Sequence, residues 1–307
     1  MKHLDTLFHL DAGDVDEIFA RTDELKKQWA GGERRPVLTG QVMTLLFEKP
    51  SLRTRISFEA AMTHLGGSST FLSTAEAGLN GRESVADVAR VLGSFSDFIV
   101  MRTFEQSLIE RFAQHADCPV INGLSNDSHP CQALTDFYTI REVFGSLKGL
   151  RVAYVGDGNN VASSLAVCAG LLKVPYVVSS PAGYELSPEF LKKLKQAIPN
   201  VDITLEEEPK QAVQEADVVY TDVWASMGQE SESDARKQVF APYCVDAALM
   251  AAAAPDAKFM HCLPAKRGLE CTDEVIDGPA SIAFEQAENR MHVAKGILAW
   301  LTSVNAK

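Results

Sequence analysis

Short apolar runs rich in β-branched and aromatic residues alternate along the chain with longer segments of helical periodicity. Runs that are apolar on both faces are typical of strands in a parallel sheet that helices cover on each side. The predicted strands are Val42–Phe47, Thr70–Ser73, Phe98–Met101, Val120–Leu124, Val152–Val155, Val177–Ser180, Ile203–Leu205, Val218–Val223 and Phe259–Cys262.

Helical patterns lie between these runs. The predicted helices are Ser51–Leu65, Ser84–Leu92, Pro130–Val143, Ala162–Leu172 and Phe284–Leu301. Pro130 suits a first-turn position, where its missing N–H costs no hydrogen bond. The alternation of strand and helix predicts an α/β fold with right-handed crossover connections.

A break in the pattern at residues 145–149 (GSLKG) precedes a fresh strand near the middle of the 307-residue chain. A chain of this length holds about two domains. We therefore expect two similar-sized α/β domains, each a mostly parallel sheet flanked by helices, over residues 1–144 and 145–284. The C-terminal helix, 285–307, is expected to pack back on the first domain, and it and Pro130–Val143 are expected to bridge the two.

Composition narrows the functional classes. The formal net charge of −12 argues against a protein whose main work is to bind nucleic-acid phosphates, although a local basic pocket for a small anion is compatible with it. The six cysteines are scattered and form no C-x-x-C pair, which favours free thiols in a reducing cytoplasm. The chain has no run of ~18 apolar residues, so no transmembrane helix and no membrane association are expected.

The sharpest local motif is residues 49–55, KPSLRTR, which follows a predicted strand and opens a predicted helix. Hydroxyls and guanidiniums there lie beside unpaired backbone N–H groups and the positive end of a helix dipole, an arrangement that suits phosphate. A capped helix with solvated arginines is the alternative. The motif is not a Walker A loop, because no G-x-x-x-x-G-K-[ST] occurs in the chain.

A second turn between strand and helix, residues 155–162 (VGDGNNVA), invites a dinucleotide-binding interpretation. The third glycine of G-x-G-x-x-G is absent, with Val161 in its place. The paired amides Asn159 and Asn160 are better suited to a polar small ligand than to a pyrophosphate. A nucleotide-dependent dehydrogenase is therefore disfavoured.

Further polar residues follow predicted strands. His129 and Gln132, three apart at a helix start, suit a carbonyl oxygen and an amide N–H₂, and a helix cap is the alternative. Asp222 ends a strand and suits an amine, because ligands of open α/β sheets bind beyond the carboxyl ends of strands; a loop-capping role is the alternative. On local grounds Arg290 is a surface charge.

The adjacent residues His261 and Cys262 also end a strand. No third or fourth ligand is spaced near them, so a zinc site is not expected. A buried thiol beside a hydrogen-bonded histidine is the simpler interpretation.

Taken in order, these motifs resemble the aspartate/ornithine carbamoyltransferase family over essentially the whole chain. The segments that carry the resemblance are residues 51–55 (SLRTR), 101–103 (MRT), 129–132 (HPCQ), 157–160 (DGNN), 222 with 226–228 (D…SMG) and 261–264 (HCLP). The pattern is closest to that of the members acting on ornithine.

The resemblance implies a site for each substrate. Phosphate would be bound by Ser51, Leu52, Arg53, Thr54, Arg55 and Arg102. The carbamoyl group would lie against Arg102, His129, Gln132, Cys262, Leu263 and Arg290, among which Arg102, His129, Cys262 and Arg290 are the expected catalytic residues. Ornithine would be held by Asn160, Asp222, Ser226 and Met227.

The implied reaction is carbamoyl transfer from carbamoyl phosphate to the δ-amine of L-ornithine, which gives L-citrulline and phosphate. Cationic donors suit the charge that builds on the carbonyl oxygen and the departing phosphate. No metal and no organic cofactor is expected. Asp222, Cys262 or a phosphate oxygen are open candidates for the proton acceptor. The resemblance also implies a homotrimer or an assembly of trimers, with active sites at subunit interfaces.

Two departures from the family pattern bear on this expectation. Leu52 stands where many members have Thr, which leaves its backbone N–H as the contact. Gly78 stands where many members that use ornithine have a Gln that reaches a neighbouring subunit's site, so either Asn80 takes that role or the contact is lost.

Two alternatives to the ornithine reaction are kept. One is a sibling enzyme that uses N-acylated ornithine, putrescine or aspartate, and the other is a non-catalytic protein that binds carbamoyl phosphate.

Overall fold

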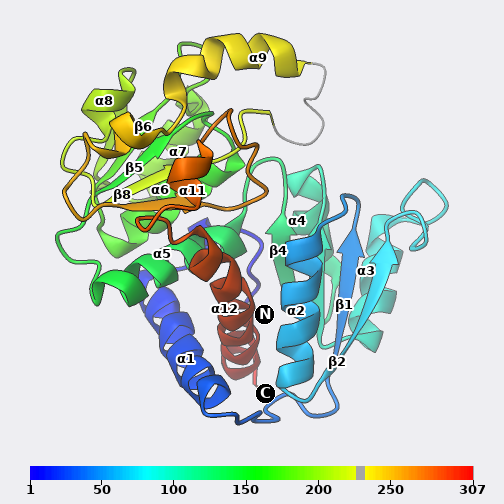
Figure 1. Ribbon diagram of the computed structural model, residues 1–307. Helices are drawn as coiled ribbons and strands as arrows, with labels where there is room; N and C mark the ends of the chain where they lie inside the picture. Colours follow the sequence, from blue (N-terminus) through cyan, green and yellow to red (C-terminus); the bar gives the residue numbers. More distant parts are fainter. Residues whose placement is uncertain (226–231, 307) are drawn as a thin grey trace. The chain divides into compact units, whose positions relative to one another are not determined.

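The computed structural model describes residues 1–225 and 232–306. The chain divides into two compact units, Met1–Tyr138 with Glu288–Lys307, and Thr139–Ala287. Two long helices, α5 (Pro130–Phe144) and α12 (Ala283–Val304), contribute residues to both units. Each unit is built around its own sheet (Figure 1).

The first unit holds a four-stranded sheet in the order β2-β1-β3-β4, with every neighbouring pair parallel. Its strands are β1 (Val42–Phe47), β2 (Ser68–Ser73), β3 (Phe98–Arg102) and β4 (Val120–Leu124). Strands β3 and β1 are almost wholly buried, which explains why they read as continuous apolar runs in the sequence.

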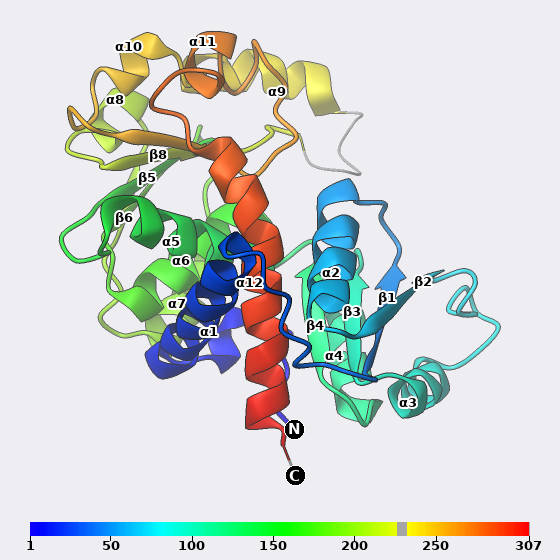
Figure 2. The same cartoon turned by 60° about the horizontal axis from the view of Figure 1, so that its bottom comes forward.

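Helices cover both faces of this sheet (Figure 2). They are α2 (Leu52–His64) on one face and α3 (Val85–Phe95) and α4 (Gln106–His115) on the other, and the unit also contains η1 (Leu7–His9) and α1 (Ala12–Ala30). Val88 of α3 and Phe112 of α4 pack with Leu46, Ile99 and Met101 of the strands in one core. The connection from β1 to β2 runs across the sheet in one direction, and those from β2 to β3 and from β3 to β4 run in the other. Because each crossover is right-handed, the reversal places the helices on opposite faces.

The second unit holds a five-stranded, fully parallel sheet in the order β7-β6-β5-β8-β9. Its strands are β5 (Val152–Val155), β6 (Tyr176–Ser179), β7 (Ile203–Glu206), β8 (Val218–Thr221) and β9 (Lys258–His261). Its other helices are α6 (Asn160–Leu172), α7 (Pro188–Ala197), α8 (Pro209–Ala212), α9 (Ser233–Phe240), η3 (Ala241–Tyr243), α10 (Ala247–Met250) and α11 (Asp273–Ile276).

One glycine of this unit is required by packing. A Cβ on Gly158, in the turn after β5, would lie 2.4 Å from the backbone carbon of Glu185. The backbone of Gly158 also donates to Tyr184 O at 2.8 Å, so the turn after β5 is held directly against the segment after β6. Only glycine permits this close approach of two backbones.

The predicted α/β class, with parallel sheets flanked by helices, is confirmed. Every predicted strand exists with bounds within two residues of those expected, and the predicted helices exist with similar agreement. The expectation was incomplete for α1, α4 and α7, which have amphipathic patterns that mixed charged residues obscure, and for the short helices after β6. No helix in the described part of the chain is long and apolar enough to cross a membrane.

Candidate active site

In each unit the chemistry-bearing loops follow the two strands at which the chain changes direction across the sheet. The first unit places residues 48–54 after β1 and residues 102–104 after β3, its neighbour. The second unit places residues 156–160 after β5 and Asp222 after β8. At such switch points the loops diverge, which opens a crevice for ligands at the carboxyl ends of the strands.

The phosphate motif begins α2 with a polar cap. Ser51 is the N-cap, and its Oγ accepts from the Thr54 backbone N–H at 3.2 Å and donates to Thr54 Oγ1 at 3.0 Å. The Arg102 guanidinium, at the end of β3, donates to Thr54 Oγ1 at 3.5 Å and is buried. A buried cation, two hydroxyls and the positive end of a helix therefore converge after β1 and β3.

The other residues of the motif point in different directions. Arg53 is half-buried in the first turn of α2. Arg55 instead pairs with Glu59 at 2.9 Å and lies 4.0 Å from the centroid of Phe71. The Leu52 side chain is 73% exposed, so only its backbone is available to a ligand bound at the cap.

His129, Gln132 and Arg290 form a second group in the first unit. Nη1 of Arg290 lies 3.4 Å from Nε2 of His129 and donates to Oε1 of Gln132, while Gln132 Nε2 donates to Asp136 Oδ1 at 2.7 Å. Arg290 is 4% exposed, so the surface position favoured by its local sequence is wrong. Its Nη2 has no hydrogen-bond partner in residues 1–225 or 232–306.

The electrostatics of this group keep the histidine neutral. Burial lowers the pKa of His129 well below 6.5, and the nearby Arg290 and Arg102 charges lower it further. With Nε2 facing a guanidinium donor, the single ring hydrogen belongs on Nδ1. His129 is therefore a neutral hydrogen-bond donor beside two cations.

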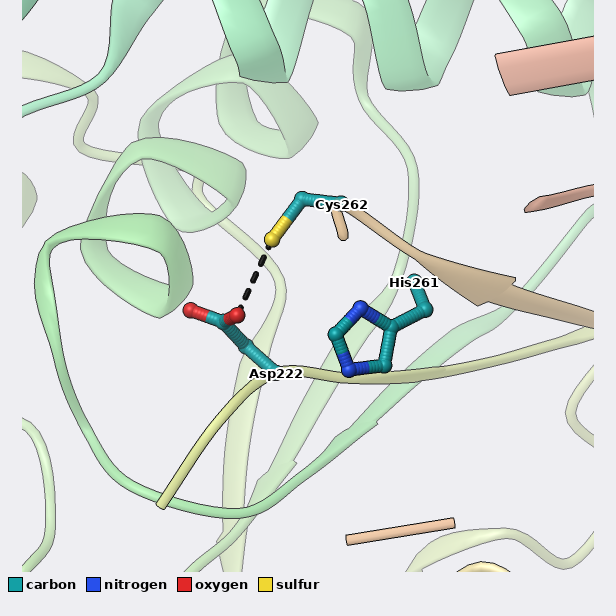
Figure 3. Close-up of side chains that lie close together, drawn as sticks. All are labelled: Asp222, His261 and Cys262. Atoms are coloured by element: carbon teal, nitrogen blue, oxygen red, sulfur yellow. Dashed lines mark hydrogen bonds between the residues drawn. The ribbon is translucent and has the colours of Figure 1, made fainter. Parts of the chain in front are cut away.

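In the second unit, Asp222 accepts two hydrogen bonds. Asn159 Nδ2 donates to its Oδ2 at 3.0 Å. The Cys262 thiol donates to its Oδ1 at 3.0 Å, as Figure 3 shows. Asn159 also caps α6, since its Oδ1 accepts from two backbone N–H groups in the first turn. Asn160, the expected ligand residue, begins the helix itself. The carboxylate of Asp222 is thus fixed in direction at the end of β8.

Residues 261–263 form a tight turn after β9. The Leu263 N–H donates to His261 Nδ1 at 2.8 Å, and Leu263 has a φ of 58°. His261 Nε2 lies 3.3 Å from Glu270 Oε1, with both residues fully buried. Because Nδ1 accepts, the ring hydrogen is on Nε2 and donates to Glu270. A left-handed, non-glycine residue beside a candidate site is a feature that its surroundings must hold in place.

Asp222, His261 and Cys262 together offer ligand atoms within 4.8 Å of one another. The sequence spacing that argued against zinc did not anticipate Asp222 beside the other two, because Asp222 comes from a different strand. Both imidazole nitrogens of His261 already contact protein groups, so metal ligation by His261 would require one of these contacts to break.

The contacts of two buried cations, Arg236 and Lys49, were not predicted from the sequence, although Lys49 belongs to the motif at residues 49–55. Arg236 of α9 donates to Asp157 Oδ2 at 3.0 Å and to the Trp224 carbonyl at 2.8 Å, and burial raises the pKa of Asp157 to about 6. Lys49 is buried, and its Nζ donates to Asn126 Oδ1 at 2.7 Å. Asp157 and Asn126 are far from these cations in the sequence, so no local pattern signals the two contacts, whereas the second ion pair of Arg236, with Glu232 at 3.0 Å, lies within one helical turn. Ser226 and Met227 lie outside the described residues.

Comparison with known proteins identifies both halves of the chain. Residues 2–142 match the family model for the carbamoyl-P binding domain of aspartate/ornithine carbamoyltransferases. Residues 148–301 match the model for the Asp/Orn binding domain of the same proteins.

Individual relatives agree over nearly full length. The chain is 48% identical to ornithine carbamoyltransferase of Bacillus subtilis over 97% of this chain and 92% of the relative. The solved structure of ornithine carbamoyltransferase from Pyrococcus furiosus has a TM-score of 0.93 at 45% identity and covers 97% of this chain and 96% of that one. Anabolic ornithine carbamoyltransferase from Campylobacter jejuni has a TM-score of 0.93 at 35% identity, covering 99% and 100% of the two chains.

Proposed function

The chain belongs to the aspartate/ornithine carbamoyltransferase family, and on that premise we propose how its residues act. It transfers the carbamoyl group of carbamoyl phosphate to the δ-amine of L-ornithine, which gives L-citrulline and phosphate. Relatives at 46–48% identity over more than nine-tenths of the chain carry the name of this activity. The first unit is the proposed carbamoyl phosphate site and the second the proposed ornithine site.

The buried guanidinium of Arg290 is the observation that carries the proposal. It has no carboxylate partner in the described part of the chain, and its contacts are the neutral groups of His129 and Gln132. Burying a cation without a counter-charge costs several kcal/mol, which a bound anion or a developing oxyanion would offset. A carbamoyl oxygen that gains negative charge in the transition state is such a group.

Roles follow from this arrangement. We propose that Ser51, Thr54 and the backbone of Leu52 bind the phosphate group together with Arg53, Arg55 and Arg102. Arg102, His129 and Arg290 stabilise charge on the carbamoyl oxygen and the leaving phosphate. Gln132, Cys262 and Leu263 line the carbamoyl group. Asn160, Asp222, Ser226 and Met227 hold the amino and carboxylate groups of ornithine.

The chemistry is attack by the neutral δ-amine on the carbamoyl carbon, with loss of phosphate and one proton. The Cys262 thiol keeps its hydrogen in the resting arrangement, because that hydrogen is donated to Asp222. This supports Asp222 as an orienting acceptor for an ammonium group rather than Cys262 as a base. A phosphate oxygen is left as the simplest acceptor for the amine proton.

A colorimetric assay for ureido products tests the reaction and the amine specificity together. Purified protein receives carbamoyl phosphate with ornithine, N-acetylornithine, putrescine or aspartate in parallel. Product with ornithine alone is expected. Product with a different amine would contradict the assignment of Asp222 and its neighbours, and absence of product with every amine would contradict the proposed activity.

We further propose that the enzyme is a homotrimer that works in the cytoplasm. Exposed apolar residues on α2, Leu52 at 73% and Ile56 at 51%, are one helical turn apart and support a subunit contact on that helix. All six cysteines are free thiols, which supports a reducing compartment.

A further inference from the structure

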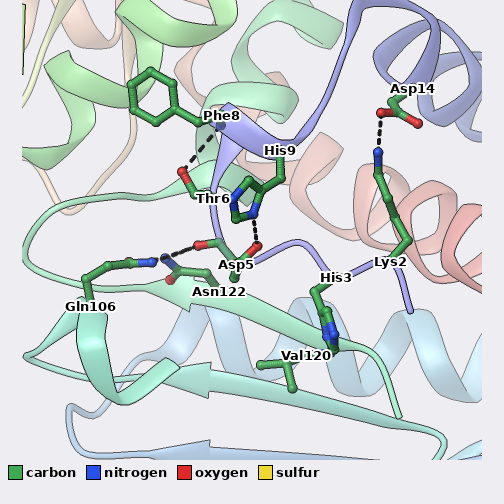
Figure 4. Close-up of polar contacts among 10 residues, drawn as sticks. All are labelled: Lys2, His3, Asp5, Thr6, Phe8, His9, Asp14, Gln106, Val120 and Asn122. Atoms are coloured by element: carbon green, nitrogen blue, oxygen red, sulfur yellow. Dashed lines mark hydrogen bonds and ion pairs between the residues drawn. The ribbon is translucent and has the colours of Figure 1, made fainter. Parts of the chain in front are cut away.

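Away from the substrate groups, Gln106 joins three parts of the first unit. Its Nε2 donates to the Asp5 carbonyl at 3.2 Å, and its Oε1 accepts from Asn122 Nδ2 at 3.0 Å and from Ser125 Oγ at 2.7 Å. Figure 4 shows the amides of Gln106 and Asn122 side by side, both directed at the backbone of Asp5. One side chain at the start of α4 thus connects the N-terminal segment, β4 and the loop after β4.

The N-terminal segment is itself fixed to the sheet. Leu4 N–H donates to the Val120 carbonyl at 2.9 Å, and Asn122 N–H donates to the Leu4 carbonyl at 2.8 Å. Leu4 is fully buried. The segment therefore covers the open edge of β4 and presents the Asp5 carbonyl as a fixed acceptor for Gln106.

Ser125 shapes the loop that leads to His129. It is fully buried, and its Oγ accepts from the backbone N–H groups of Asp127 at 3.3 Å and Ser128 at 3.1 Å. The Ser125 N–H donates to the Ser128 carbonyl at 2.8 Å, which closes the turn. His129 follows immediately, and its carbonyl accepts from Gln132 N–H in the first turn of α5. The position of the imidazole thus depends on a turn that one hydroxyl organises.

We propose that Ser125 and Gln106 are positioning residues of carbamoyl transfer. They hold the turn 125–128 so that the neutral imidazole of His129 meets the carbamoyl oxygen, and neither touches substrate. The inference rests on the proposed function. A displacement of about 1 Å at a reacting group costs on the order of 100-fold in rate, so loss of the turn should lower kcat far more than it weakens binding of ornithine.

The test compares Ser125→Ala, Gln106→Ala and the double variant with a matched control, Ser96→Ala. Ser96 is buried in the same unit at the amino end of β3, where its hydroxyl bonds Thr44 Oγ1 at 2.6 Å. We expect Ser125→Ala and Gln106→Ala to lower kcat about 10- to 100-fold with the ornithine KM within about twofold. The double variant should be no slower than the slower single variant, because both residues act through one turn.

Ser96→Ala should lower the melting temperature about as much as Ser125→Ala does, because each variant removes one buried hydroxyl. It should not lower kcat. Values of kcat within about twofold of wild type in the folded Ser125→Ala and Gln106→Ala proteins would overturn the proposal. So would multiplicative losses in the double variant, or an equal kcat loss in Ser96→Ala. If Gln106→Ala fails to fold, Gln106→Met keeps the chain length and tests the same contacts.

Hydrogen exchange separates this proposal from the proposed function. The amides of Asp127 and Ser128 should exchange faster in Ser125→Ala than in wild type, whether or not the enzyme makes citrulline. Inactive wild-type protein with this change in exchange would refute the activity and leave the turn assignment standing. Unchanged exchange together with unchanged kcat would refute the role of Ser125.

Discussion

Burial of the Arg290 charge costs folding free energy, but the same charge suits the proposed function. Its guanidinium is 4% exposed and contacts only neutral side chains in the described part of the chain. Groups arranged for a charge that appears only in a transition state are unsatisfied, or satisfied by weak partners, before substrate binds. Under the proposed function Arg290 fits that description, because its hydrogen-bonding contacts in the described residues are His129 and Gln132.

Replacement of Arg290 by glutamine should therefore affect activity and stability in opposite senses. We expect Arg290→Gln to lower kcat by about 100- to 1,000-fold, as for loss of one donor to an oxyanion. Its melting temperature should be unchanged or higher, since a buried uncompensated charge is removed. Steady-state kinetics and thermal denaturation measure both. Arg90→Gln, which removes an exposed arginine paired with Asp87, is the control and should leave kcat unchanged. A large loss of stability in Arg290→Gln would indicate a structural role.

The same variant tests the cause of the His129 pKa. Burial and the two arginine charges lower this pKa below 6.5, so the folded state favours the neutral ring. The resulting stabilisation is complete above pH 6.5 and is lost as the pH falls through the lowered pKa. In Arg290→Gln the pKa of His129 should rise toward 6.5, as followed by NMR of the imidazole. An unchanged titration would show that the Arg290 charge does not act on this ring.

At the scale of elements, the candidate site residues lie mainly in the loops after β1 and β3 and in the loops after β5 and β8. Parallel strands bring their carboxyl ends to one edge of a sheet, and a reversal of crossover direction separates the two loops at that edge. Turns there must be tight, because the next helix starts at once and its N-terminal N–H groups face the ligand. Ser51 and Asn159 cap these helices, and Gly158 permits the close backbone contact after β5.

Gly158→Ala tests that contact. The added Cβ would meet the Glu185 backbone at 2.4 Å, and backbone cannot move aside as a flexible side chain can. We expect the free energy of unfolding to fall by about 1–3 kcal/mol, as in overpacked interiors. Gly31→Ala is the matched control, because its Cβ would meet nothing closer than 3.4 Å, and its effect should be within about 0.5 kcal/mol. Chemical denaturation measures both, and equal stabilities would contradict the packing argument.

At the scale of the whole molecule, two units with separate cores and separate sheets carry the two proposed substrate sites. The chain runs from the first unit into the second through α5 and returns through α12, so the sequence of the first unit is discontinuous. Arg290 belongs to the returning part, which is why a residue near the end of the chain meets His129 and Gln132. Two apolar residues on α2, Leu52 and Ile56, form a stripe that is exposed in the single chain.

The proposed homotrimer predicts a mass for the assembly. Light scattering coupled to size-exclusion chromatography should give about three times the 33.4 kDa chain mass, or a multiple of that value. Ile56→Asp, which places a charge on the stripe, should shift the mass toward the single chain, whereas Val304→Asp, on an equally apolar and 41% exposed residue of α12, should not. A monomeric wild-type protein would contradict the trimer.

Features of this protein that depend on local pattern could be predicted from consecutive residues. The strand Val152–Val155 was predictable to the residue, because a strand buried on both faces is apolar throughout and ends at polar turn residues. The phosphate motif at residues 49–55 was recognisable because the chemistry of a helix N-terminus is written in consecutive residues.

Contacts between residues that are distant in the sequence could be identified only from the folded chain. The fold buried Arg290 beside His129, brought Asn159 and Cys262 onto Asp222, and joined Gln106 to the turn before His129. The free energy of such contacts depends on desolvation and charge in the folded interior, which residues adjacent in the sequence do not encode. Local pattern therefore predicted the loops that follow the strands. The path of the chain through the fold determined which side chains from different loops and helices contact each other.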